Sequence, residues 1–173
     1  MDDIEDTNTE SDFAEMIEEA KEESNVMWNA IKPVSSHSHV MCFIYNGTAE
    51  TFALNYSSWD SSKESHRYTL QPWDYVSFVL RGDIPYFANG RQTTKTQHNF
   101  SYRSAHHAFE FSTTLKVAKK YDPLSFSPPT IPIQQHQVLS NGKVPLRCSS
   151  KMTHSLTNKP YHYAILISLG KAP

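Results

Sequence analysis

Glycine is scarce in this chain, and the glycines present do not form a phosphate-binding loop. Only five occur among 173 residues, and none lies in a GxGxxG or GxxxxGK pattern, where backbone must approach a phosphate closely. No GxSxG nucleophile segment and no HExxH zinc motif occurs either. We therefore predict no enzyme, no cofactor and no metal site; an enzyme whose site is assembled only in space stays open as an alternative.

Cysteines and long apolar runs are also few. Cys42 and Cys148 are the only cysteines, which excludes a disulfide framework and a thiolate metal site and predicts two free thiols. No apolar run is long enough to span a bilayer, and the first residues are acidic where a secretory signal is positive. We expect a cytoplasmic protein, peripheral at a membrane or in a virion, with no signal peptide and no transmembrane segment.

The two ends of the chain differ in charge, although the formal net charge is only −2. Residues 1–24 contain eleven carboxylates and one lysine, whereas the remainder contains 15 of the 16 Lys+Arg and 7 of the 18 Asp+Glu. A solubilising tail would explain such a pattern, but it is also typical of an interaction arm beside an anion-seeking body.

Aromatic residues make up 12% of the chain, which favours strands. We predict a mainly β protein: an antiparallel β-sandwich or barrel of eight to ten short strands, preceded by one N-terminal amphipathic α-helix. Residues 1–11 are predicted to be a disordered acidic tail, 12–32 the helix, and 34–173 a single β-rich domain with a Pro-rich connection at 121–132. Ser11 or Asp12 is expected to cap the helix, and Pro33 to end it.

Apolar residues recur at helical spacing before Pro33 and define an interaction helix. They are Phe13, Met16, Ile17, Ala20, Met27, Trp28 and Ile31. Beyond Pro33 the apolar period falls to two, and turn signals recur about every ten residues. The predicted strands are 40–45, 51–56, 65–70, 75–80, 94–102, 108–117, 131–139, 144–148 and 162–169.

The basic residues suggest an anion-binding surface, because cations on strand faces and loop rims can bind phosphates of lipid or nucleic acid. The candidates are Arg81, Arg91, Lys95, Arg103, Lys116, Lys119, Lys120, Lys143, Arg147 and Lys151. Lys143, Arg147 and Lys151 are predicted to alternate on one strand face. The adjacent His106 and His107 are predicted to face opposite sides of a strand.

The segment His162-Tyr-Ala-Ile-Leu-Ile-Ser-Leu-Gly-Lys-Ala172 resembles the closing strand of sea-anemone pore-forming cytolysins over about ten residues. Those proteins also place an amphipathic helix before a β-sandwich, so the resemblance implies a membrane-active alternative in which the helix inserts. The aromatic site for lipid headgroups that these toxins carry has no counterpart in this sequence.

Together these features predict a non-enzymatic assembly protein, such as a small viral matrix-type structural protein. Its basic body would bind an anionic membrane surface or a nucleoprotein, and the chain would form a homo-oligomer. The acidic arm would bind a basic partner, screen the basic surface, or clip one subunit to the next. Its glutamates are expected near Lys116, Lys119, Lys120 or near Lys143, Arg147 and Lys151. The sequence leaves these roles of the arm open.

Overall fold

The computed structural model describes residues 3–85, 93–120, 123–124, 126 and 129–170, with side chains from Asp12 onward. Its elements are α1 (Asp3–Ile31), β1 (Ser38–Gly47), β2 (Ala53–Ser57), the 3-10 helix η1 (Ser62–Tyr68), β3 (Tyr75–Gly82), β4 (Thr93–Arg103), β5 (Ala108–Lys119), β6 (Thr130–Ser140), β7 (Cys148–Ser155) and β8 (Tyr163–Gly170). In this part of the chain the strands form two four-stranded sheets, ordered β3-β1-β8-β7 and β2-β4-β5-β6.

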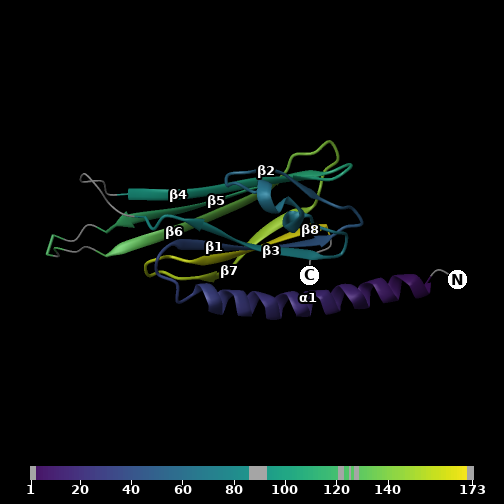
Figure 1. The fold of residues 1–173 in the computed structure, drawn as a ribbon, viewed down its shortest axis with the longest axis horizontal. Coiled ribbons are helices and arrows are strands. Elements are labelled where there is room, and N and C mark those ends of the chain that lie inside the picture. The colour runs from purple at the N-terminus through teal and green to yellow at the C-terminus, as the bar shows by residue number, and fades with distance from the viewer. Residues whose placement is uncertain (1–2, 86–92, 121–122, 125, 127–128, 171–173) are drawn as a thin grey trace.

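The two sheets face each other, and α1 lies along the outside of the β3-β1-β8-β7 sheet (Figure 1). The predicted β-sandwich preceded by one helix is therefore confirmed. One pairing departs from the antiparallel rule, because the central strands β1 and β8 run parallel to each other.

Strands β1 and β8 are buried on both faces. Cys42 and Ile44 point into the core between the sheets, whereas Met41 and Phe43 point toward α1. Strands covered on both sides have continuous apolar sequences rather than alternating ones, as in the run from Val40 to Tyr45. The outer face of this sheet therefore needs a covering layer, and α1 provides it.

The core between the sheets is built on aromatic rings. Phe100 lies at its centre, with its ring centroid 5.0 Å from that of Phe111 and 5.5 Å from that of Phe78. The buried Tyr102 donates a hydrogen bond of 2.9 Å from its hydroxyl to the carbonyl of Tyr68. A buried phenol needs such a partner, so the Tyr102 hydroxyl can stay inside the core without an unpaired polar atom.

The apolar stripe of α1 packs against its own chain. Ala20 and Trp28 are buried against Met41, Phe43 and neighbouring side chains of the sheet. The other stripe residues with apolar contacts in the same cluster are Met16, Ile17, Met27 and Ile31. The helix therefore belongs to the folded unit.

Aromatic contacts hold α1 against the sheet at two points along the helix. Phe13 meets the edge of Trp73 with ring centroids 5.7 Å apart, and the Trp28 ring stacks on His154 at 4.8 Å. Between them, the carboxylate of Glu23 accepts hydrogen bonds from the hydroxyls of Tyr75 and Ser77 on β3. Glu23 thus meets hydroxyl groups of β3, whereas Lys151, one of the cations near which the sequence placed the helix glutamates, lies beside α1.

The helix begins at Asp3, well before the predicted start, so Ser11 and Asp12 lie inside it and do not cap it. The helix ends at Ile31, just before Pro33, close to the predicted boundary.

Two predicted strands are wrong. Residues 65–70 form most of η1 and then a single bridge from Leu70 to Phe52. Residues 144–147 form a loop, because Pro145 has no N–H to donate and Leu146 turns inward to be buried; β7 begins only at Cys148. The mostly polar sequence of β7 lacks the apolar alternation that marks a strand.

The predicted Pro-rich connection at 121–132 is shorter than expected. β6 begins at Thr130 and includes Pro132, which pairs with Val117 of β5. Proline is tolerated here because β6 is the edge strand of its sheet. Residues 121–122, 125 and 127–128 of the connection lie outside the described part of the chain.

Candidate anion-binding face and pocket

The outer face of the β2-β4-β5-β6 sheet carries exposed cations. Along β4 and β5 the apolar residues point inward, so the alternate positions point outward. Lys95 and Arg103 on β4 and Lys116 on β5 are all exposed on this outer face. Helix α1 lies against the other sheet (Figure 1), so it leaves these three cations uncovered.

Lys95 and Lys116 are directly opposite each other in the β4–β5 pairing. Side chains in such positions have Cβ atoms about 5 Å apart, and like charges there destabilise a sheet. The adjacent outward positions hold Gln97, Thr114 and Ile133 rather than a carboxylate. This lysine pair therefore favours a bound anion, which would relieve the repulsion.

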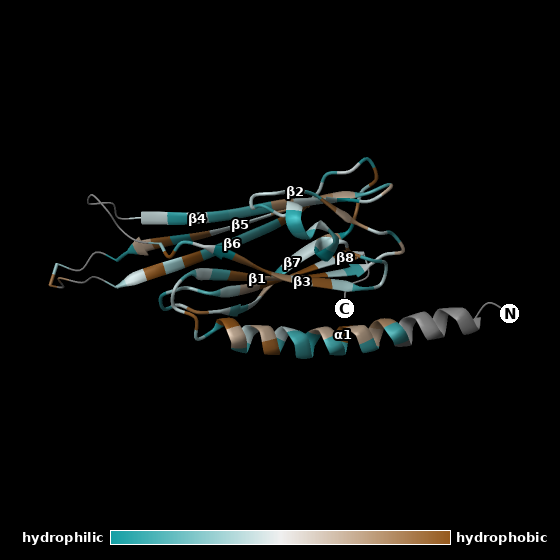
Figure 2. Ribbon diagram, in the orientation of Figure 1, coloured by the Kyte–Doolittle hydropathy of each residue, from teal (hydrophilic) through white to brown (hydrophobic). Residues whose placement is uncertain are grey.

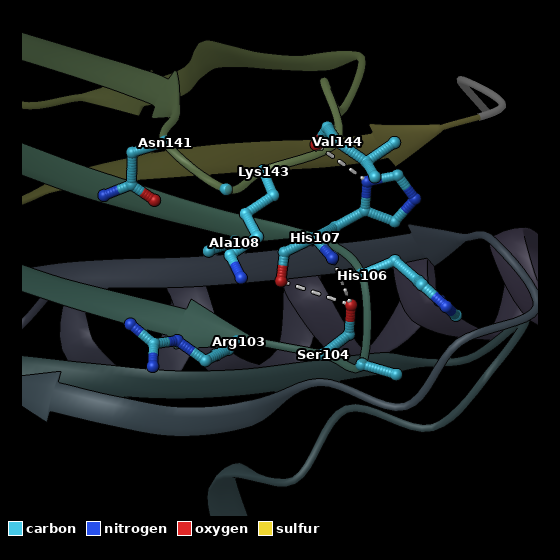
Figure 3. A pocket seen from close by; sticks show the side chains of 10 residues that line it. Arg103, Ser104, His106, His107, Ala108, Asn141, Lys143 and Val144 are labelled. Atoms are coloured by element: carbon cyan, nitrogen blue, oxygen red, sulfur yellow. Dashed lines mark hydrogen bonds between the residues drawn. The ribbon is translucent and has the colours of Figure 1, made fainter.

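Arg103 lies at the other end of β4, beside a cavity of about 400 Å³. The cavity lies between the turn after β4 and the loop after β6, and Lys143 reaches it from that loop (Figure 3). His106 and His107 line the same cavity. Arg103 and Lys143 are the two permanent cations at this space, because the Nδ1 atoms of His106 and His107 are engaged with Glu50 and with the Val144 carbonyl.

A single carboxylate, Glu50, organises the turn after β4. It accepts hydrogen bonds from the Ser104 hydroxyl and from His106 Nδ1, and His107 Nε2 lies 3.8 Å from it. The Ser104 hydroxyl, and then the His106 ring, hold the pKa of Glu50 below its ordinary value. Because the Ser104 hydroxyl donates to Glu50, it is not aimed at an imidazole as a serine nucleophile would be.

The loop that carries Lys143 lies close against this turn. Asn141 N–H donates to the carbonyl of Ala108 at 3.0 Å, and a side chain at Gly142 would place its Cβ 2.5 Å from the Ala108 nitrogen. Glycine is therefore required at position 142, since any larger residue would push the loop away. The close approach holds Lys143 at the rim of the cavity.

The structure does not gather all the predicted cations. Arg81 on β3 and Lys151 on β7 belong to the helix-covered sheet, where Lys151 lines a cavity of about 430 Å³ beside α1. Lys119 and Lys120 lie at the end of β5, and Arg147 lies in the loop before β7. Arg91 lies outside the described residues.

Two arrangements expected from sequence are wrong. Lys143, Arg147 and Lys151 do not alternate on one strand, because β7 begins only after Arg147. His106 and His107 do not face opposite sides of a strand, because both lie in the turn between β4 and β5 and approach Glu50. Their partner is far away in sequence, so only the fold brings them together.

A separate histidine cluster fixes the connection between α1 and β1. His162, fully buried, accepts a hydrogen bond of 3.0 Å from His39 N–H at Nδ1 and donates one of 2.6 Å from Nε2 to the Val34 carbonyl. Desolvation, with His162, His37 and Arg81 nearby, lowers the pKa of His39. The His162 ring thus links the backbone of β1 to the segment after α1, and in the described residues no three metal-ligating side chains converge.

Comparisons with protein-family models, curated proteins and solved structures found no match to this chain. Over the residues that the structure describes, no helix is both long and apolar enough to cross a bilayer. The described residues separate an acidic helix from a sheet face that carries exposed lysines and an arginine.

Proposed function

We propose that this protein is a non-enzymatic assembly protein that binds phosphate-bearing surfaces through the outer face of the β2-β4-β5-β6 sheet. The observation that carries the proposal is the pair Lys95 and Lys116, placed directly opposite each other with no carboxylate in the adjacent outward positions. Sheets avoid such pairs unless something offsets the repulsion. Arg103 and Lys143 line the cavity at the far end of the sheet, where the exposed Glu110 of β5 also lies on the outer face.

The acidic helix gives the molecule a second, oppositely charged side. The exposed carboxylates of α1 lie on the outside of the other sheet, so they are separated from the lysine pair by the thickness of the sandwich. Two sheets and a helix stack to about 20 Å. The carboxylates would then be available to a basic partner or a second copy while the lysines bind an anion.

The experiment is a salt titration of the whole chain with phosphatidylserine vesicles and with single-stranded RNA. Binding is expected at about 0.05 M salt and should weaken steeply toward about 0.5 M, because phosphate contacts release counterions. If the chain bound neither the vesicles nor the RNA at low salt, the proposed function would be refuted.

A variant of helix α1 tests which side of the molecule binds the anion. Glu15, Glu19 and Glu22 are exposed on α1, and their replacement by glutamine removes three charges without touching the packed stripe. At about 0.15 M salt, where the Debye length is about 8 Å, we expect anion binding to change by less than about twofold. A much larger gain would mean that the arm screens the binding surface and that the anion binds near the helix.

A further inference from the structure

One end of the basic sheet face is also apolar. Ile131 and Ile133, on the edge strand β6, are 47% and 41% exposed and point outward like the lysines. In the pairing of β5 with β6, Ile133 lies opposite Lys116 and Ile131 opposite Ala118. Figure 2 shows these hydrophobic segments near the start of β6. We call Lys95, Lys116, Ile131 and Ile133 the basic-apolar tip.

All four residues of the tip are exposed. The neighbouring connection adds a further exposed ring, because Phe126 is fully exposed in it. Exposed aliphatic side chains are unremarkable one at a time, but here two adjacent ones lie beside a repelling lysine pair. Both the charges and the apolar groups would be stabilised by the same kind of partner.

We infer that the basic-apolar tip docks on the interface of an anionic lipid bilayer, an inference that rests on the proposed function and names its surface. Lysines keep their ammonium groups at the level of the headgroups while their stems lie along apolar surface. Each lysine near an anionic leaflet strengthens binding about fivefold, and isoleucines beside them can enter the acyl boundary. The tip presents both groups on one face.

Nucleic acid fits this tip less well. Non-specific binding of single strands uses aromatic rings on which bases stack. None of the four tip residues is aromatic, and the outward positions of β4, β5 and β6 hold no aromatic residue. Phe126 in the connection before β6 and Tyr56 on β2 are exposed, but β2 and β6 are opposite edges of the sheet, so these two rings form no row on which successive bases could stack. Isoleucine offers no flat ring to a base, whereas it transfers favourably into hydrocarbon. Charge and apolar surface together therefore favour a bilayer over RNA.

The test replaces Ile131 and Ile133 by serine in the full chain. The strand provides a matched control in Leu139, which is 49% exposed and lies on the same face of β6 but opposite Glu110. We measure flotation with vesicles of phosphatidylcholine with and without phosphatidylserine, and binding to poly(U) RNA. Unfolding curves that coincide for the variants would show that half-exposed substitutions leave the fold intact.

The double variant is expected to bind phosphatidylserine vesicles about tenfold more weakly and to lose the binding that survives about 0.5 M salt, with RNA binding unchanged. Leu139→Ser should bind vesicles like the unaltered chain. If the double variant binds vesicles as tightly as the unaltered chain, the inference is wrong while the proposed function stands. Binding of the unaltered chain to RNA but not to vesicles overturns the inference in favour of nucleic acid, and binding to neither overturns both.

Discussion

The variant Lys116→Glu is expected to be more stable than the unaltered protein and to bind anionic surfaces much more weakly. It converts the cross-strand pair with Lys95 from repulsive to attractive, which should raise the free energy of unfolding by about 0.5 kcal/mol. The same change removes one positive charge and adds a negative one, costing about 2 kcal/mol of binding, or about thirtyfold.

The matched control for this variant is Lys151→Glu. Lys151 is exposed on β7 of the other sheet, beside α1. Both variants replace a lysine by a glutamate, so they change the net charge by the same amount. Vesicle flotation and denaturant unfolding should show no comparable loss of binding and no gain in stability for Lys151→Glu. Equal weakening by both variants would indicate that net charge, rather than the outer face of the β2-β4-β5-β6 sheet, governs binding.

A second large effect is expected for Trp28→Ala in helix α1. Trp28 is 8% exposed and stacks on His154, with the apolar outer face of the sheet around it. Truncating a buried tryptophan costs about 3–5 kcal/mol, because the cavity is not refilled. The loss should appear as a lower free energy of unfolding and as faster proteolysis in residues 32–37 between α1 and β1.

Val26→Ala is the control in the same helix, since Val26 is 69% exposed and makes no contribution to the buried cluster. Alanine has the higher helix propensity, so this variant should be at least as stable as the unaltered protein. If Trp28→Ala were no less stable than Val26→Ala, the helix would not be docked through its apolar stripe.

The helix and most strands could be predicted because local sequence determines them. The stripe of Ala20 and Trp28 has helical spacing, and the alternation of Phe109 with Phe111 marks a strand with one buried face. The errors occurred where the local signal was weak or misleading. Strand β7 is too polar to recognise, and residues 65–70 have strand-like composition but form η1.

Some contacts of the candidate site could be predicted from sequence, whereas others require the tertiary structure. The pairing of Lys95 with Lys116 follows from a turn at residues 104–107, because register is fixed once a hairpin turn is placed. The meeting of Arg103 and Lys143 does not follow from sequence, since it needs the loop after β6 to fold against that turn. The contacts of Glu50 with His106 and His107 likewise could not be predicted without the tertiary fold.

The most direct measurement is lysine acetylation of the unaltered chain, followed by mass spectrometry, with and without phosphatidylserine vesicles. Lys95 and Lys116 are exposed on the outer face of the β2-β4-β5-β6 sheet, whereas Lys21 and Lys151 are exposed on the helix side of the molecule. The expected result is slower acetylation of Lys95 and Lys116 when vesicles are present, with Lys21 and Lys151 unchanged. Protection of Lys21 and Lys151 instead, or of all four equally, would contradict binding through the basic sheet face.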